Sequence, residues 1–477
     1  MHIFSIVILA FFVINIFRKA KFKNKLIWQT AFTVFIYLFV NRGYFIESKI
    51  LNVDNWQGVL ILHFLFLVAY KKIRRINNSA LLYCTYLVFS VALLVVFPAN
   101  GVRLVGGDGR IDRFLSGAKE YLTTAPFTKL TIFFCGLAIL QIIVMSSTFR
   151  LMDKDDIREL IRVMAIFVKI VVGIVIIEFL LKNVLQTGNL YNEILIRIFG
   201  YGTASYNDLA LRGNTYMLTG LNREGSHIVY SLAIGVGILF ADMKIRKQKR
   251  EGIWIFVAML MMIVSKAFTF VLAFIFIALL YIIYYTYSMN KTMLKRELQA
   301  VVLLCVLTVG LPIAWYLANL LFGPDGYIMT RLSDAIATVS QIFQQGEAYF
   351  SSLSRLESTT VRFYSVVHTL GNWLQRPLLG VGIATTYCHG PAVLTLCEIG
   401  VLGVVFFYRA YFRPVILASK NKKAVMLTVI VWFALSTLSG VAVRLYVGID
   451  GFILAYCMQA LLESEDKGQK IIGVKLR

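Results

Sequence analysis

Two short segments hold the polar residues best suited to chemistry. The first is residues 218–227 (LTGLNREGSH), which places an arginine, a carboxylate and a histidine directly before an apolar run. Arg223, Glu224 and His227 can together orient a sugar or a phosphate, and Glu224 is better suited to holding an arginine than to acting as a base. They can equally be interfacial anchors and a hydrogen-bonded helix histidine, so both interpretations stay open.

The second segment precedes a later apolar run. It consists of residues 375–382 (QRPLLGVG), then His389 followed by Gly-Pro, and then residues 398–403 (EIGVLG). Proline and glycine predict an irregular turn here. His389 would then lie at a water–membrane boundary, where an imidazole with a pKa near neutrality can act as a general base. The alternative is an interfacial histidine that only caps a helix or forms a hydrogen bond.

The composition indicates what kind of fold must position these residues. Of 477 residues, 59% are hydrophobic and 15% charged, and the mean hydropathy is +0.75. Soluble domains are less apolar and more charged, which excludes an ordinary soluble enzyme, a disordered chain and a nucleic-acid-binding module. We predict an all-α, polytopic integral membrane helix bundle. The six cysteines lie mostly within apolar runs and are interpreted as small buried hydrophobic residues.

Thirteen apolar runs approach the length that a membrane-spanning helix needs. They divide the chain into N-terminal spans over 1–318 with outer loops at 41–55, 98–126 and 182–225, a large loop at 319–390, and C-terminal spans with a tail over 391–477. The predicted spans are 3–17, 26–40, 56–70, 79–97, 127–148, 163–181, 226–242, 252–264, 267–288, 298–318, 391–408, 424–440 and 448–462.

The distribution of basic residues predicts the orientation. The formal net charge is +23, and the connections on one side of the membrane hold 30 of the 48 lysines and arginines. Such a bias marks the cytoplasmic side, so we expect the N-terminus outside and the C-terminus inside. The net charge therefore reflects topology, and it is no evidence for a nucleic-acid partner.

The outer loops differ from the cytoplasmic ones in which basic residue predominates. They contain twelve arginines and three lysines. Guanidinium groups bind phosphate bidentately, which suggests a site for an anionic lipid head group such as a diphosphate; pairing with outer carboxylates is the alternative. In the large loop, helical spacing of apolar residues predicts two amphipathic helices, over 328–343 and 361–374, the second following a Ser-Thr-Thr stretch at 358–360 suited to N-capping.

At these two segments the sequence resembles the O-antigen polymerase and O-antigen ligase superfamily. The Arg-Pro-Leu-Leu-Gly-Val-Gly turn, His389 and the Glu-x-Gly-x-x-Gly start of the next span are similar to the family's pattern, as is the element at 221–226. The large outer loop before the closing spans also fits. The resemblance covers roughly residues 200–460. It departs from the family where Gly390 follows the histidine, and where the main loop lacks the Arg-x10-Gly signature of some polymerases.

The resemblance implies a GT-C-like glycosyltransferase in the bacterial inner membrane that uses an undecaprenyl-diphosphate-linked oligosaccharide at the periplasmic face. His389 is then the candidate base or acceptor-positioning group, and Glu224 a second polar group of the catalytic site. The candidates for binding the diphosphate are Arg223, Arg362 and Arg376, followed by Arg355 and Arg444. No cofactor is expected, and catalysis is expected to be metal-independent. Membrane lipid and a chain-length regulator are the further partners implied.

Three functions remain open from the sequence. A polymerase of repeat units is favoured by the size of the chain and its divergent loop. An O-antigen ligase that transfers the glycan to lipid A core is the first alternative. A lipid-linked oligosaccharide flippase or transporter is the second, although the inverted repeats and midplane polar residues typical of transporters are not evident in the sequence.

Overall fold

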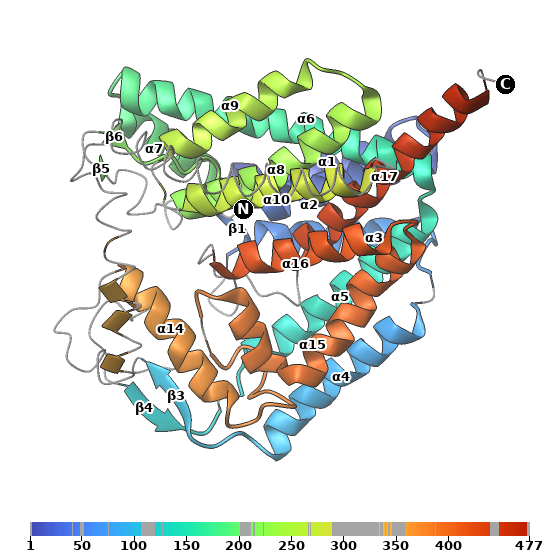
Figure 1. The fold of residues 1–477 in the computed structure, drawn as a ribbon. Coiled ribbons are helices and arrows are strands. Elements are labelled where there is room, and N and C mark those ends of the chain that lie inside the picture. The colour runs from blue at the N-terminus through green and yellow to red at the C-terminus, as the bar shows by residue number, and fades with distance from the viewer. Residues whose placement is uncertain are drawn as a thin grey trace.

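The computed structural model in Figure 1 describes most of the chain. The described residues are 2–40, 42–47, 52–74, 76–105, 120–125, 127–200, 211–212, 215–222, 224–265, 267, 269–288, 358–386, 388–438 and 448–474, with a few single positions between 333 and 345.

The described residues form a mainly helical protein. The helices are α1 (Ile3–Phe17), α2 (Phe22–Phe39), α3 (Asn55–Ala69), α4 (Asn78–Val96), α5 (Lys129–Leu151), α6 (Lys154–Phe179) with the π-helical turn η2 (Leu180–Val184), α7 (Gly188–Phe199), α8 (Gly225–Arg246), α9 (Glu251–Val264), α10 (Thr269–Ser288), α14 (Ser358–Trp373), α15 (Pro391–Ala418), α16 (Lys422–Leu438) and α17 (Ile449–Val474).

The helices follow the apolar runs of the sequence. Every predicted span coincides with a helix except 298–318, which lies outside the described residues. Six helices of the described part are long and apolar enough to cross a membrane: α4, α5, α6 with η2, α8, α10 and α15. The chain is therefore a helical, multi-pass membrane protein, as predicted. The number of thirteen spans and the GT-C likeness stay predictions.

Three short antiparallel hairpins were not predicted from the sequence. They are β1 (Tyr44–Ile46) with β2 (Val53–Asp54), β3 (Val102–Val105) with β4 (Glu120–Thr123), and β5 (Leu211–Arg212) with β6 (Thr215–Tyr216). All three fall within the predicted outer loops 41–55, 98–126 and 182–225. Hairpin pairing satisfies backbone groups of these loops without a helix.

The helices form a closed ring around α17. Successive neighbours in the ring are α2, α3, α5, α4, α15, α16, α10, α8 and α6, and α6 packs back onto α2. Helix α17 contacts α8 and α16 most extensively, and it also touches α15, α10, α6 and α2. Helix α9 covers α8 and α6, whereas α14 packs on α15. The predicted second loop helix (361–374) is α14, which begins at Ser358; the first (328–343) falls mostly outside the described residues.

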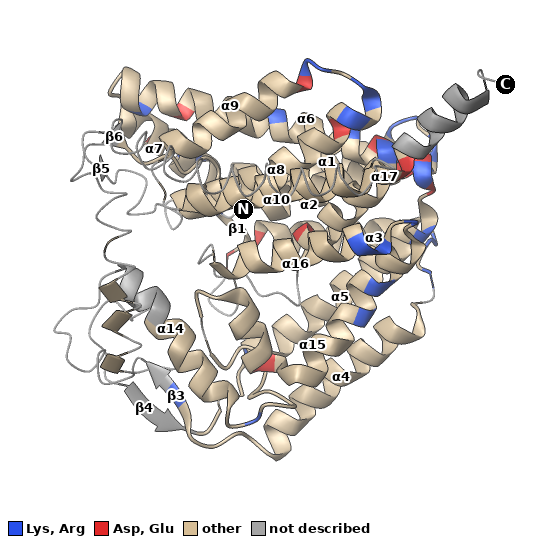
Figure 2. Cartoon of the chain, in the orientation of Figure 1, with Lys and Arg blue, Asp and Glu red and all other residues tan. Residues whose placement is uncertain are grey.

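Lysines and arginines gather at one end of this bundle, on the right of Figure 2. There Lys23 pairs with Asp153 at 2.5 Å, joining the connection after α1 to the start of α6. The Lys23 ammonium lowers the pKa of the Asp153 carboxyl to about 2. Lys154 pairs with Glu463 on α17 at 2.8 Å. Three of the segments predicted to share one side of the membrane thus meet in space.

The predicted outer loops meet at the opposite end. The Arg42 guanidinium donates to the carbonyl oxygen of Asn222 at 2.7 Å, joining the first outer loop to the third. The Asn372 amide on α14 donates to the carbonyl oxygen of Arg103 on β3 at 2.9 Å. These contacts place the described parts of the outer loops away from the basic end; the side of the membrane that each loop faces stays a prediction.

Candidate functional site

A glycine-rich turn fills a break in helix α15. Gly400 has φ +65° and interrupts the helix, so the carbonyl oxygens before it lose their intrahelical partners. Backbone N–H groups of the turn donate to these carbonyl oxygens instead. The Val381 N–H donates to the Cys397 oxygen at 2.8 Å, and the Gly382 N–H donates to the Glu398 oxygen at 3.1 Å. Within a membrane protein, non-helical backbone is tolerated only where such partners exist.

The exchange of hydrogen bonds is reciprocal. Past the break, the N–H groups of Val401 and Leu402 would ordinarily bond to carbonyls one turn earlier in the helix. They donate instead to the carbonyl oxygens of Pro377 and Leu378, at 3.0 and 3.1 Å. Residues 377–382 thereby supply the hydrogen-bond partners that one turn of α15 lacks. These four bonds hold the Pro-x-x-Gly-x-Gly turn against α15.

Glycine is required at this junction for steric reasons. A Cβ on Gly400 would lie 2.3 Å from the carbonyl oxygen of Leu378, and one on Gly380 would lie 2.5 Å from that of Glu398. Both glycines also have positive φ, which other residues rarely adopt. The Tyr86 hydroxyl on α4 donates to the Ile399 oxygen at 2.5 Å and completes the junction. The glycines of the motif thus build the turn that leads to His389.

His389 follows this turn by seven residues and is held by α14. The Ser365 hydroxyl oxygen lies 3.2 Å from His389 Nδ1 and accepts the His389 backbone N–H at 3.1 Å. Ser365 is fully buried, whereas His389 is half-buried. The neighbouring Cys388 is buried too, and burial raises the pKa of its thiol. A neutral thiol is a poor nucleophile, so His389 is the group here that is suited to proton transfer.

Two of the arginines predicted to bind diphosphate lie on segments that adjoin His389. Arg376, on the turn, donates to the carbonyl oxygen of Pro98 at 3.4 Å. Arg362 lies on α14, one turn before Ser365. Helix α14 is in turn docked on β3, because the Arg103 N–H donates to the Asn372 side-chain oxygen at 2.7 Å. Arg362 on α14 and Arg376 on the turn thus lie on the two segments that adjoin His389, one through Ser365 and the other along the chain.

The segment around Glu224 is anchored separately, by a buried ion pair on α6 and η2. Glu178 and Lys182 are fully buried, and their charged groups lie 2.7 Å apart. The Glu178 carboxylate also accepts the N–H of Gly220 at 2.6 Å and the N–H of Thr219 at 3.0 Å. Charge-assisted hydrogen bonds of this kind are among the strongest in proteins. They fix the loop that leads into α8.

Glu224 itself lies just before α8. Its carboxylate accepts the hydroxyl of Ser226 at 3.2 Å. The loop before it is held from the other side by Arg42, which is buried and bonds to Asn222. Arg42 was one of the outer arginines in the sequence, and its position shows a structural role in joining two loops.

Three of the predicted diphosphate-binding residues, Arg223, Arg355 and Arg444, lie outside the described residues. The two motif segments are carried by different helices, one by α6 and α8 and the other by α14 and α15. Both belong to the end of the bundle where α7, α14 and the hairpins β3–β4 and β5–β6 lie, at the left of Figure 1.

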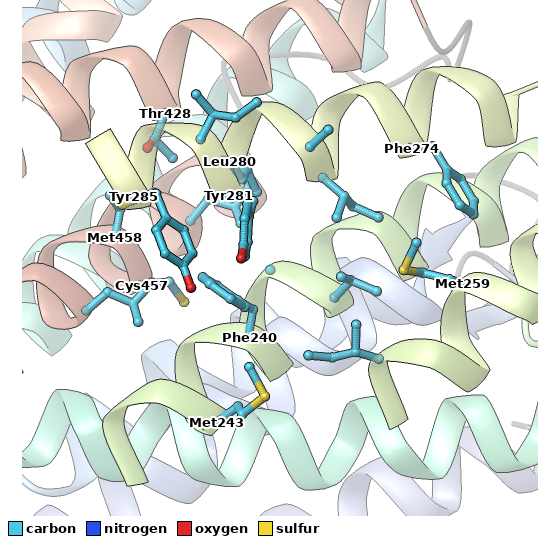
Figure 3. Close-up of a pocket in the computed structure, with 18 of the residues that line it drawn as sticks. Phe240, Met243, Met259, Phe274, Leu280, Tyr281, Tyr285, Thr428, Cys457 and Met458 are labelled. Carbon is cyan, nitrogen blue, oxygen red and sulfur yellow. The ribbon is translucent and has the colours of Figure 1, made fainter. Parts of the chain in front are cut away.

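A large apolar cavity opens between α8, α9, α10, α16 and α17 (Figure 3). Its volume is about 750 Å³. The lining is almost wholly apolar and aromatic, and it includes Phe240, Met243, Met259, Tyr281 and Tyr285. Such a lining suits a hydrocarbon chain. Phe240 and Met243 occupy the half of α8 nearer the basic end, so the cavity lies on that side of the bundle.

Metal-ligating residues do not cluster in the part of the chain that the structure describes. There, no group of three or more His, Cys, Asp or Glu side chains is placed to hold a metal ion.

Comparison with known proteins gives no relative: no family model, curated protein or solved structure matches this chain.

Three contacts of the site were not identified from the sequence. Ser365 contacts His389 across 24 positions, Glu178 reaches Thr219 across 41, and Tyr86 reaches Ile399 across 313. Glu178 and Tyr86 lie inside apolar runs of the sequence, and a polar group there indicates a hydrogen-bond or ion-pair partner. No local pattern indicated which partner it would be.

Proposed function

We propose that this protein is a metal-independent glycosyltransferase that polymerises undecaprenyl-diphosphate-linked oligosaccharide repeat units at the outer face of the bacterial inner membrane. A sugar hydroxyl of the acceptor attacks the anomeric carbon of the donor. The bond from that carbon to the diphosphate oxygen breaks, and undecaprenyl diphosphate leaves. His389 accepts the hydroxyl proton.

The observation that carries the proposal is how His389 is held: Ser365 on α14 contacts it at two atoms, and the turn that precedes it is fixed on α15. In the tautomer that donates from Nδ1 to Ser365, Nε2 holds the lone pair that a general base needs. The turn is fixed by four backbone hydrogen bonds to the two sides of the break in α15. Rigid support of this kind favours catalysis, because a base must be held within hydrogen-bond reach of its proton.

Arginine side chains supply the second requirement, which is stabilisation of the leaving diphosphate. Arg362 lies on α14, the helix that holds His389, Arg376 lies on the turn that precedes His389, and Arg223 adjoins Glu224 in the sequence. Fixed guanidinium groups stabilise negative charge that develops in the transition state. Arg355 and Arg444 are weaker candidates from the sequence alone.

The apolar cavity supplies a place for the lipid part of the donor. A polyprenyl chain offers only hydrocarbon surface, which matches the lining between α8 and α10 in Figure 3. Burial of that surface contributes about 25 cal/mol per Å². We assign this cavity to the part of the undecaprenyl chain farthest from the diphosphate, because the cavity lies nearer the basic end of the bundle and His389 lies at the other end.

The test is the product formed by the purified chain from undecaprenyl-diphosphate repeat units. Wild-type protein is expected to give a ladder of longer glycans on the lipid carrier and to release undecaprenyl diphosphate. The His389→Ala variant is expected to give neither. A His389→Ala variant with full chain extension contradicts the assignment of the base.

A deletion strain separates the alternatives. Loss of a polymerase leaves lipid A core bearing one repeat unit, whereas loss of a ligase leaves none. Loss of a flippase stops supply at the outer face, yet the purified flippase would not lengthen glycans in the assay above.

A further inference from the structure

A second cavity lies at the opposite, basic end of the bundle. It has a volume of about 510 Å³ and lies between the start of α4, the end of α5 and the second half of α15. Its lining contains three arginines, Arg150, Arg409 and Arg413, together with the polar residues Asn77, Asn78 and Ser79. No carboxylate is among the described residues that line it.

This concentration of positive charge is unlike the rest of the basic end. Several other arginines there are paired with acids: Arg158 with Asp155, Arg162 with Glu159, and Arg246 with Asp242 and Glu251. Arg18 and Arg250 donate instead to the side-chain oxygens of Asn24 and Gln248. Within the described part of the chain, no carboxylate lies within 4 Å of Arg409 or Arg413. Arg150, Arg409 and Arg413 are all exposed, and positive side chains gathered around one opening create a potential that attracts an anion.

The positions of these groups suit a phosphate. Arg409 and Arg413 are four residues apart on α15, so their side chains leave the same face of the helix. Arg150 faces them from the last turn of α5. The first turn of α4, with Asn77 as N-cap, adds the positive end of a helix dipole. Planar guanidinium groups on two helices can bind a phosphate bidentately.

An adjoining crevice points to a lipid as the source of that phosphate. A smaller cavity of about 100 Å³ shares Asn77, Arg150 and Pro414 with the first and extends between α5, α15 and α17. Its walls are mainly apolar and include Ile142, Met145, Phe149, Ala410 and Phe452. A charged cavity that leads into an apolar crevice fits a head group joined to a hydrocarbon chain.

We propose that Arg150, Arg409 and Arg413 bind the phosphate head group of an anionic phospholipid from the leaflet at the basic end, with the start of its acyl chain in the crevice beside Phe149. Basic pockets between transmembrane helices bind anionic lipids at the cytoplasmic side of many membranes. This site is separate from the candidate site around His389, and it does not depend on the glycosyltransferase proposal.

The test measures lipid binding to the purified full-length protein in neutral detergent. Phosphatidylglycerol and phosphatidylcholine with identical dioleoyl chains are titrated, and glycerol phosphate and inorganic phosphate are titrated separately. The readouts are the shift in Tm and the lipid retained in native mass spectrometry. Phosphatidylglycerol is expected to raise the Tm of the wild type and to be retained, and phosphatidylcholine is expected to do neither.

Arginine variants test whether phosphatidylglycerol binds at this cavity. Arg409→Gln and Arg413→Gln are each expected to weaken phosphatidylglycerol binding about tenfold, the loss of roughly one charge-assisted hydrogen bond. Arg162→Gln, which removes an acid-paired arginine at the same end, is the control and is expected to bind like the wild type. Arg413→Lys keeps the charge, loses the bidentate fork, and is expected to bind at an intermediate level.

Three results would overturn the proposal. One is equal stabilisation by the two lipids. Another is unchanged phosphatidylglycerol binding by the Arg409→Gln/Arg413→Gln double variant. The third is equal stabilisation by glycerol phosphate or inorganic phosphate, which would identify a site for a soluble anion.

Discussion

Ser365 holds His389 at two points, at the Nδ1 atom of its ring and at its backbone N–H. The serine comes from α14 and the histidine from the segment just before α15, so one hydroxyl joins two parts of the predicted loop 319–390 at the start of α15. The orientation of the imidazole thus depends on how α14 packs on α15.

Removal of the histidine should abolish chain extension. We expect His389→Ala to lower the rate by about 10²–10⁴-fold, the usual contribution of a general base. His2→Gln, which alters another histidine of the same end that pairs with Glu47, should leave the rate near that of the wild type. The rate of glycan elongation is the measurement, and an equal loss in both variants would indicate a general structural effect.

Ser365 is predicted to be a positioning residue. Ser365→Ala should lower the elongation rate about 10-fold or more and shift the pH–rate profile, because the ring loses the partner that selects its tautomer. Ser365→Thr retains the hydroxyl and should restore much of the rate. A Ser365→Ala variant with a slower rate and an unshifted profile would argue against this role.

Arg376 should matter through the shape of its guanidinium group as well as its charge. Arg376→Lys is expected to raise the KM for the lipid-linked donor about tenfold, because an ammonium group cannot bind the diphosphate bidentately. Arg197→Lys, on the exposed face of α7, is the matched control and should leave KM unchanged. A change in kcat alone would indicate that Arg376 acts on the reacting atoms.

The break in α15 should tolerate no side chain. Gly400→Ala combines positive φ with an approach of 2.3 Å to the Leu378 oxygen, and we expect a loss of more than about 2 kcal/mol of stability. Gly173→Ala in α6, where an added Cβ meets nothing within 4 Å, should be neutral or stabilising by about 0.5–1 kcal/mol. Thermal unfolding in detergent measures both, and equal Tm values would contradict the prediction.

The Glu178–Lys182 pair should show strong coupling. Glu178→Gln and Lys182→Met are each expected to cost about 3–5 kcal/mol, because each leaves a buried charge without its partner. The double variant should lose less than the sum of the two. A double-mutant cycle by denaturant unfolding measures the coupling, and strict additivity would show that the loop at 219–220, rather than the ion pair, determines the cost.

The Lys23–Asp153 ion pair should make a pH-dependent contribution to stability. The pKa of Asp153 is lowered to about 2 in the folded protein, against about 3.9 for an unperturbed aspartate. The stabilisation is therefore present above about pH 4, and it is lost as the pH falls towards 2. Lys23→Gln should weaken this dependence, because the backbone N–H groups of Asp155 and Asp156 still bond to Asp153, and Lys19→Gln should leave it unchanged, as measured by Tm against pH.

The sequence by itself determined the class of fold and the gathering of basic residues at one end. Apolar runs of sufficient length must become helices in a membrane, because hydrocarbon satisfies no backbone group, and the described helices follow those runs. Within the described residues, lysines and arginines gather at one end of the bundle, because charged groups avoid the membrane interior; the side that each loop faces stays a prediction. The Pro/Gly pattern at 375–382 correctly predicted an irregular turn.

Only the tertiary structure decided what those features contact. The turn at 377–382 fits a break around Gly400, Ser365 reaches His389 from a separate helix, and Glu178 holds the loop at 219–220. Arg42 proved to join two loops, although its residue type suggested a ligand site. The physical reason is that sequence periodicity records which face of a helix is apolar, whereas a hydrogen bond between distant segments depends on how whole helices pack. The outer arginines are an example. Their residue type predicts that they bind an anion, whereas the groups that they actually contact are decided by how the loops pack.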